Sequence, residues 1–347
     1  MLTLPSLPSL DGKSPEELLS VLLHEEYGTP PPPLRAVHGE TVSTDERFCA
    51  GHAPLLTVRL TCETDDFTFS FPIRIACPKG KTKLPALLHL NFQDKMPDIY
   101  QPTEELTDEG FAVLTLFYRD VTSDNGDFTD GLAGKIYPDG VQTETGCGKI
   151  MMWAWAATAV YAYATTLPEI DPTRISVIGH SRLGKTALLA GALERRFYAA
   201  YSNDSGCSGA ALVRGADKES AETVKVITTA FPYWFCRRYA RYAEKEDEMP
   251  FDQHFLLAAN VSHLVYVASA SLDLWASPEN EYRACVAASD YFEAHGRHPF
   301  VHPDRLPKVG ECFHEGDIGY HLREGMHYLN RTDWQLFLRF LKKKMHE

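Results

Sequence analysis

The stretch RISVIGHSRLGK, residues 174–185, carries the strongest structural signal of this sequence. A run rich in β-branched residues leads into a Gly-x-Ser turn at Gly179 and Ser181, and residues that favour helices follow. At such a strand-to-helix corner the backbone is strained, and the serine hydroxyl points into a pocket at the carboxyl end of a sheet. The stretch therefore predicts a nucleophile elbow with Ser181 as the nucleophile. A buried serine in an ordinary tight turn is the alternative.

Two cations follow the serine in what we expect to be the first turn of a helix. Arg182 and Lys185 would oppose the helix dipole there, so a negative charge on a substrate or transition state explains them better than solvation does. We expect the amide of Arg182 to stabilise an oxyanion, with a second donor near residues 91–93. The usual second glycine, two places after the serine, is replaced by Leu183, and Gly184 lies one place later.

Short apolar runs on both sides of the elbow are typical of parallel strands that are buried on both faces. These runs lie at residues 85–90, 111–117, 175–178 and 264–270. Helical patterns alternate with them, at residues 148–166, 186–196, 279–295 and 333–344. Together with the elbow, this alternation predicts an α/β-hydrolase fold: a doubly wound, mostly parallel sheet with helices on both faces, in a three-layer αβα sandwich.

The amino-terminal part has a different pattern. Ser14, Pro15 and Glu17 form a capping box that predicts a helix from about Pro15 to His24, and four prolines at 30–33 exclude a helix or a central strand. Alternating runs at 55–60 and 67–75 then predict an antiparallel pair at the sheet edge.

The chain shows no repeat, low-complexity tract or long linker. We therefore expect a single catalytic domain over residues 1–347, with residues 1–35 as a helical and proline-rich lead-in. Residues 118–145 lack periodicity and are rich in Gly, Asp and Thr, which predicts a long surface loop of the kind that shapes a pocket.

The composition excludes several classes of protein. A net charge of -13 argues against a nucleic-acid surface, and no segment approaches the roughly 20 apolar residues of a membrane span. Residues 1–28 lack the pattern of a signal peptide, so a cytoplasmic location is the default expectation unless a leader precedes this chain. The 8 cysteines are scattered without a CxxC pair and are expected to be reduced thiols, with disulfides as the alternative. We expect no metal and no cofactor, because there is no HExxH motif or clustered ligand set.

A serine hydroxyl is a weak nucleophile and needs a base. In hydrolases whose catalytic residues follow the order Ser, acid, His along the chain, this base lies near the carboxyl end. The candidates are His314, His321 and His327. His327 follows a glycine in a loop just before the final helix, where an imidazole can reach over the elbow. We expect His327 to be the base, and the other two to be structural or surface residues.

An acid must orient the imidazole. Asp273 follows the apolar run 264–270, the usual place for the acid in this fold, whereas Asp204 follows a run at 198–202 after the elbow helix. Either could instead be a cap or a turn residue, and the sequence leaves the choice between them open. Trp275 is either a core residue or, at a pocket lip, an aromatic surface for a sugar ring.

Several motifs resemble the glucuronoyl esterases of carbohydrate esterase family 15, from about Leu84 to the end of the chain. They are GHSRLGK at 179–185, NDSGCSGAA at 203–211 with Arg214, FPYWF at 231–235, DQH at 252–254, and Gly325-x-His327. The first motif is specific, because it accounts together for the displaced glycine, the arginine and the lysine.

The resemblance implies hydrolysis of the ester that joins 4-O-methyl-glucuronic acid on xylan to alcohols of lignin. By position it makes Ser181 the nucleophile and His327 the base, and it assigns Arg182 to the oxyanion and Lys185 to the sugar hydroxyls. Asp204 falls where the family often places a glutamate, and Asp273 where some bacterial members place their acid. By the same resemblance Trp275 matches a sugar-contacting tryptophan, and Glu222 matches a uronate-contacting glutamate.

One departure from the family pattern concerns a disulfide. Secreted fungal members carry cysteines beside the catalytic serine and histidine, where this chain has His180 and Tyr328. This difference favours an intracellular, bacterial-type enzyme. The lack of a secretion signal in this chain favours a small carbohydrate ester as the substrate. Two other hypotheses stay open: an acetyl esterase for xylan-type sugars, and a carbohydrate-binding protein that keeps the fold without turnover.

Overall fold

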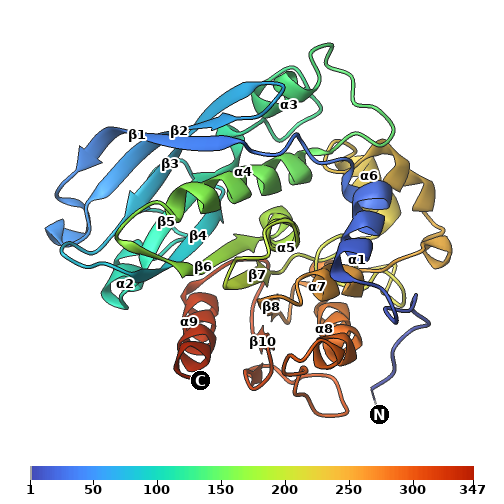
Figure 1. Ribbon diagram of the computed structural model, residues 1–347. Coiled ribbons are helices and arrows are strands. Elements are labelled where there is room, and N and C mark those ends of the chain that lie inside the picture. The colour runs from blue at the N-terminus through green and yellow to red at the C-terminus, as the bar shows by residue number, and fades with distance from the viewer. Residues whose placement is uncertain (1) are drawn as a thin grey trace.

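The structure, a computed structural model that describes residues 2–347, is built on one mixed sheet of 10 strands with helices on both faces (Figure 1). The strand order is β1-β2-β3-β5-β4-β6-β7-β8-β10-β9. The strands are β1 (Ala36–Asp45), β2 (Leu55–Glu63), β3 (Thr68–Ala76), β4 (Leu84–Asn91), β5 (Ala112–Phe117), β6 (Ile170–His180), β7 (Ala199–Asn203), β8 (Leu264–Ala270), β9 (Cys312–Phe313) and β10 (Ile318–Arg323).

The central strands of the sheet run parallel, and the outer strands on both sides pair in antiparallel fashion. Strand β5 pairs with β4, β4 with β6, β6 with β7, β7 with β8 and β8 with β10, all in parallel. Strands β1, β2 and β3 form an antiparallel ribbon joined to β5, and β9 closes the other edge in antiparallel fashion. The predicted mostly parallel sheet is confirmed, as is the antiparallel pair at its edge.

Helices form the outer layers. They are α1 (Pro15–Leu22), α2 (Thr103–Asp108), α3 (Gly131–Ile136), α4 (Lys149–Ala164), α5 (Arg182–Leu193), α6 (Val224–Ala230), α7 (His254–Ala259), α8 (Pro278–Ala294) and α9 (Arg331–His346). Buried residues of α2 and α9 pack on one face of the sheet, and those of α1, α4, α5, α7 and α8 pack in a larger cluster with the other face. The result is the predicted three-layer arrangement.

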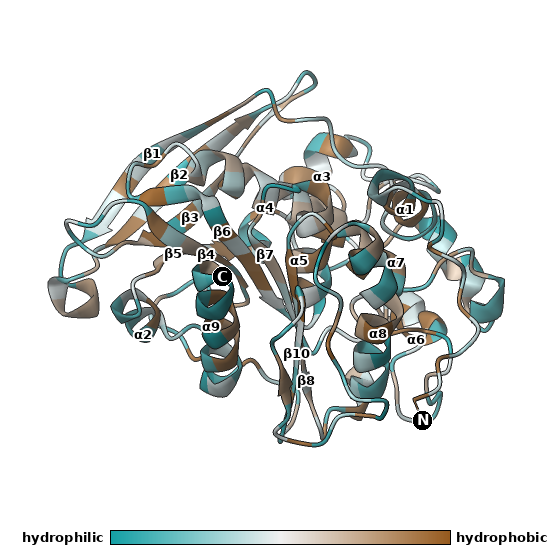
Figure 2. Ribbon diagram, turned by 60° about the horizontal axis from the view of Figure 1, so that its bottom comes forward, coloured by the Kyte–Doolittle hydropathy of each residue, from teal (hydrophilic) through white to brown (hydrophobic). Residues whose placement is uncertain are grey.

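Strand β8 shows why the central strands are apolar throughout. Its Val265 and Val267 point into the larger core, whereas Tyr266 and Ala268 point toward α9. Because alternate residues face opposite layers, both sets must be hydrophobic. Figure 2 shows the same pattern, with hydrophobic colouring concentrated on the central strands and hydrophilic residues on the outer side of α9.

Three predictions of local structure were incomplete or wrong. The sequence did not indicate β1, because eight of its ten residues are exposed and no apolar alternation marks it. The helix after the elbow, α5, spans Arg182–Leu193, so its first turn holds Arg182 and Lys185 as expected, but it begins and ends earlier than the helical pattern at 186–196. Residues 118–145 are not a plain surface loop, since they contain α3 and bury Phe128 and Leu132 in the core.

Within residues 2–347, none of the helices combines the length and apolarity that crossing a bilayer requires. All eight cysteines in this range are free thiols. The parallel strands place their carboxyl ends along a single edge of the sheet, so the segments that follow β4, β5, β6, β7, β8 and β10 meet there. All the predicted site residues that directly follow these strands gather at this edge.

Candidate active site

Ser181 occupies the corner between β6 and α5 in a strained conformation. Its φ of 59° and ψ of −129° lie outside the regions that L-residues favour. The chain turns so tightly that a Cβ on Gly179 would come 1.9 Å from the carbonyl oxygen of Leu183. The amide of Ser181 donates to Asn203 O at 2.8 Å, which ties the corner to the end of β7. This geometry is that of the predicted nucleophile elbow.

The displaced glycine also has a structural reason. A Cβ on Gly184 would lie 3.0 Å from both the Ser202 hydroxyl and the Ser205 side chain, so the close approach of α5 to β7 and the following loop favours glycine at this position. Arg182 is the first residue of α5, where backbone amides have no partner within the helix. The amide end of α5 therefore faces the space next to Ser181.

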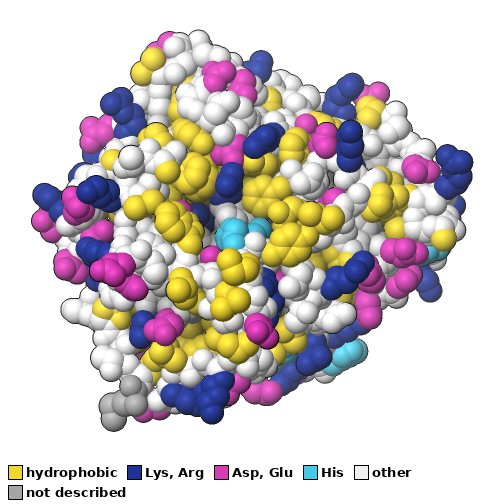
Figure 3. Space-filling model, turned by 180° about the vertical axis from the view of Figure 1, so that it is seen from behind, with side chains coloured by type: hydrophobic (Ala, Val, Ile, Leu, Met, Phe, Trp, Pro, Cys, Tyr) yellow, Lys and Arg dark blue, Asp and Glu magenta, His cyan; other side chains and the backbone are white. Residues whose placement is uncertain are grey.

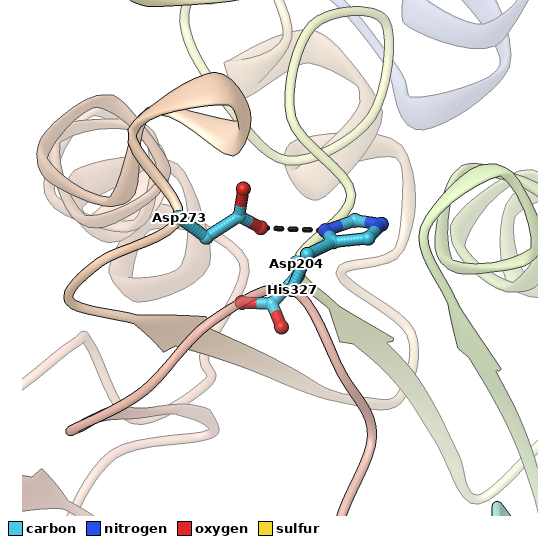
Figure 4. A group of neighbouring side chains, drawn as sticks. All are labelled: Asp204, Asp273 and His327. Carbon is cyan, nitrogen blue, oxygen red and sulfur yellow. Dashed lines mark hydrogen bonds and ion pairs between the residues drawn. The ribbon is translucent and has the colours of Figure 1, made fainter.

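His327 and Asp273 form a hydrogen-bonded pair beside the elbow. The Nδ1 atom of His327 lies 2.6 Å from Asp273 Oδ2 (Figure 4). Since a carboxylate can only accept, Nδ1 carries the proton and Nε2 is left as the acceptor. The loops that hold the two residues are themselves joined, because the amide of Leu272 donates to Gly325 O at 2.9 Å.

Asp204, the other acid candidate, makes different contacts. Its Oδ1 accepts from the Ala270 amide at 2.8 Å and its Oδ2 from the Arg323 guanidinium at 3.3 Å. It is buried, and this burial, followed by the nearby Glu281 carboxylate, raises its pKa well above the usual value. Asp204 lies next to the pair, yet the carboxylate that accepts the hydrogen bond from the imidazole is that of Asp273.

The other two histidines considered as bases lie elsewhere. The Tyr266 hydroxyl is 2.8 Å from His314 Nε2 and 2.9 Å from His321 Nδ1, on the face of the sheet that α9 covers. His321 is also 2.9 Å from Asp333 of α9. Both side chains are therefore parts of a buried network away from Ser181, in agreement with the structural role expected for them.

His180, in the place where fungal relatives were expected to have a cysteine, packs against the base. The rings of His180 and His327 are 4.4 Å apart between centroids. Burial, and next to it the charge of His327, lowers the pKa of His180 well below its usual value. A neutral His180 puts no positive charge beside His327 when the latter takes up a proton.

Arg182 is held by a residue that the sequence did not reveal. Its guanidinium forms an ion pair with Asp124, which is almost fully buried and also accepts from the Trp234 indole at 2.8 Å and the Tyr118 hydroxyl at 2.9 Å. The guanidinium stacks over the Trp234 ring at 4.8 Å. Asp124 lies in the segment 118–145, which carries no motif, so only its contacts identify it.

Lys185 is buried and bound by three acceptors. Its ammonium donates to Ser205 O at 2.6 Å, to Cys207 O, and to Glu222 Oε2 at 3.0 Å. An ammonium has three N–H donors, so this set uses all of them. Lys185 therefore fixes the segment 205–207 and the Glu222 carboxylate against α5. A ligand that binds the ammonium would share its N–H donors with these protein acceptors.

A pocket of ≈ 220 Å³ brings most of the predicted site residues together. It is lined by Ser181, Arg182, Lys185, Asp204, Ser205, Gly206, Glu222, Phe231, Trp234, Trp275, Ala276 and His327. Trp275 is 48% exposed, which excludes the core alternative and places it on the pocket lip. The face drawn in Figure 3 has a histidine side chain at its centre and hydrophobic side chains around it.

A second hollow of ≈ 440 Å³ adjoins the first at Ser181, Arg182 and His327. Phe92 and Gln93, from the turn predicted to supply a second oxyanion donor, line it. The Gln93 amide donates to the Asn91 side chain at 3.2 Å, so that amide already has a partner. The turn lies next to the serine, as predicted, but the Gln93 amide is directed to Asn91 and does not supply the expected second oxyanion donor.

Glu281 is a second residue that the sequence did not indicate. Fully buried on α8, it accepts from the amides of Ser205 at 2.8 Å and Gly206 at 3.0 Å and from the Ser269 hydroxyl at 2.6 Å. Burial raises its pKa to about 7. Glu281 thus holds the backbone of Ser205 and Gly206, which line the pocket. Its position in an amphipathic helix gave no indication of this role.

Three donor atoms could in principle hold a metal ion, because those of Asp204, Asp273 and His327 all lie within 4.8 Å of one another. These donors already have protein partners: Asp273 binds His327, and Asp204 binds the Ala270 amide and Arg323. The guanidinium of Arg323, next to Asp204, would also repel a cation. The set fits an acid–base pair with its supporting contacts better than a metal centre.

Comparisons with known proteins identify relatives of this chain. The family model described as "Glucuronyl esterase, fungi" matches residues 60–296. The carbohydrate esterase MZ0003, from an unknown prokaryotic organism, is 36% identical over 249 residues, which are 70% of this chain and 55% of that protein. A 4-O-methyl-glucuronoyl methylesterase of Podospora anserina is 28% identical over 289 residues, 81% of this chain and 55% of that protein.

Among solved structures, a promiscuous CE15 esterase from the marine bacterial metagenome is similar over 99% of this chain and 97% of that one, with a TM-score of 0.84 and 28% identity. The chain spans about half the length of the curated relatives it matches.

Proposed function

Because this chain belongs to the glucuronoyl esterase family, carbohydrate esterase family 15, we propose that it hydrolyses 4-O-methyl-glucuronoyl esters of carbohydrates derived from xylan and lignin. The observation that carries this proposal is the shared pocket of Ser181 and His327, with Asp273 bound to the imidazole. An elbow serine, a base and an orienting acid are the parts that acyl transfer through a serine requires.

The reaction has two halves. Nε2 of His327 takes the proton of the Ser181 hydroxyl as Oγ attacks the ester carbonyl carbon, and the carbonyl electrons move to the oxygen. The tetrahedral intermediate collapses and expels the alcohol, which receives the proton from His327. Water then gives a proton to His327 as it attacks the carbonyl carbon of the acyl-enzyme. The second tetrahedral intermediate collapses, the uronic acid is released, and Ser181 Oγ takes the proton back from His327. Asp273 stabilises the imidazolium in both halves.

Arg182 supports the oxyanion in this proposal, through its amide at the start of α5 and its guanidinium above the pocket. We expect Arg182→Ala to lower kcat about a hundredfold with little change in KM, because the charge that it stabilises develops only in the transition state. Steady-state kinetics with benzyl glucuronate measure this. Equal changes in kcat and KM would argue against the role.

The control for this variant must allow for folding, since Arg182→Ala leaves the buried Asp124 without its cation. Counting active sites with a fluorophosphonate probe gives kcat per folded site. Arg196→Ala removes an exposed arginine that pairs with Glu194, and we expect it to leave kcat unchanged.

The residues that would surround the acyl group of the substrate favour a sugar acid. Glu222 and Lys185 lie at its base, and the half-exposed Trp275 offers an aromatic face to the C–H face of a sugar ring. Glu222 is also tied to Trp275 by its backbone, since its amide donates to Trp275 O at 2.9 Å. A ring held between these groups would bring its carboxyl ester toward Ser181.

Replacement of Trp275 tests the substrate. We expect Trp275→Ala to raise KM for benzyl glucuronate about fivefold, as the loss of roughly 1 kcal/mol of stacking implies, and to leave 4-nitrophenyl acetate hydrolysis unchanged. Leu274→Ala is the matched control, because Leu274 is similarly exposed and lies outside the pocket lining. Cleavage of acetate alone by the native protein would favour the acetyl esterase hypothesis instead.

A further inference from the structure

The loop that carries His327 is wrapped around one buried guanidinium, that of Arg323 at the end of β10. Its Nη1 donates to Glu324 O and to Met326 O, both at 3.3 Å. Its Nη2 donates to Met326 O at 3.3 Å and to Tyr328 O. The carbonyls directly before and after His327 therefore both accept hydrogen bonds from the same side chain.

Arg323 is itself fixed from the other side. Its Nε lies 2.7 Å and 2.9 Å from the two carboxylate oxygens of Asp333, in the first turn of α9, and its Nη2 lies 3.3 Å from Asp204. All three side chains are buried, with exposures of 5% for Arg323, 0% for Asp333 and 1% for Asp204. Charge-assisted hydrogen bonds of this kind are strong and directional in a site shielded from water.

The loop needs such support. Gly325 has a φ of +127°, and a Cβ there would come 2.9 Å from Arg323 Nη1, so the chain passes close to the guanidinium at that point. Met326 is 65% exposed and the His327 side chain 40% exposed, so packing holds this segment only weakly. Asp273 orients the ring, but a single hydrogen bond to Nδ1 does not fix the backbone on either side of the base.

We propose that Arg323 is a positioning residue for His327, and that Asp204 acts on the base through Arg323 and not by direct contact. The inference rests on the proposed function in so far as Ser181 and His327 are the reacting pair. Its physical basis is the steep dependence of proton transfer on geometry, since displacement of a reacting group by about 1 Å can cost about a hundredfold in rate.

The test uses Arg323→Lys in the full chain. Lysine keeps the buried positive charge, but its compact ammonium cannot reach both the two loop carbonyls and the two carboxylates at once. Labelling by a fluorophosphonate probe gives two readouts: its amplitude counts folded sites, and its rate reports how well His327 activates Ser181. Because the probe carries no sugar, the result does not depend on the substrate.

We expect the labelling rate of Arg323→Lys to fall about 10- to 100-fold while the amplitude stays near that of the native protein. The kcat for 4-nitrophenyl acetate should fall by a similar factor, with little change in KM. Arg305→Lys is the control, because Arg305 pairs with Glu311 in the segment before β9, outside the candidate pocket, and it should label at the native rate.

A lower amplitude with an unchanged rate would mean that Arg323 serves folding alone, and would overturn the inference. If Arg323→Lys does not fold, Asp333→Asn loosens the same guanidinium and keeps the cation, and its labelling rate should fall several-fold per folded site. An unchanged rate in that variant would also overturn the inference. Failure of the native protein to react with the probe would instead reject the proposed function.

Discussion

Replacing Ser181 by alanine is expected to lower kcat for benzyl glucuronate by a factor on the order of 10⁶ and to abolish fluorophosphonate labelling. The hydroxyl oxygen is the atom that bonds to the acyl group, and Ser181 occupies the strained corner between β6 and α5. The hydrogen bonds of the corner run through the backbone, from Ser181 N to Asn203 O and from Gly184 N to Ser181 O, so alanine should leave the fold intact.

Ser262→Ala provides the control, since Ser262 is exposed and lies outside the candidate pocket. Labelling that persists in Ser181→Ala would move the nucleophile to another residue. If the native protein neither reacts with the probe nor hydrolyses benzyl glucuronate or 4-nitrophenyl acetate, the third hypothesis, a carbohydrate-binding protein without turnover, would stand.

The second large effect separates the two acids that the sequence left open. We expect Asp273→Asn to lower kcat by about 10⁴-fold, because an amide facing Nδ1 can donate its own proton and so favours the wrong tautomer of His327. Steady-state kinetics and probe labelling rates both measure the loss. The variant should fold, since Asp273 also caps a short turn through the Ala276 amide, which an asparagine oxygen can accept equally well.

Asp204→Asn is the matched comparison, with an expected loss of less than about tenfold. Its amide oxygen can still accept from the Ala270 amide, and Asp333 continues to hold Arg323. If the two losses were reversed, Asp204 would be the acid and Asp273 the supporting residue.

Sequence patterns predicted the central part of the fold well and its edge less well. The parallel strands β4, β5, β6 and β8 were recognised because each is a short run that must be hydrophobic on both faces. Strand β1 is mostly exposed and pairs with β2 through its backbone, so its residues carry no burial pattern. Strand β10 was missed for the opposite reason, since it buries His321 and Arg323 in polar networks.

The sequence by itself determined the nucleophile elbow, the alternation of buried strands and helices on both sides of it, and the candidates for the site. These are local properties: a tight turn demands particular residues within a few positions, and burial of a strand or helix imposes a period on neighbouring residues. The resemblance to one family followed from the same short motifs.

Only the tertiary structure decided which acid binds His327, which residue pairs with Arg182 and what holds the loop of the base. Asp273 and His327 are 54 positions apart, Asp124 and Arg182 are 58 apart, and Asp204 and Arg323 are 119 apart. A hydrogen bond between such segments depends on how the strands are ordered in the sheet and on the direction of the side chains at their ends. The residues next to either partner in the sequence do not indicate these two properties.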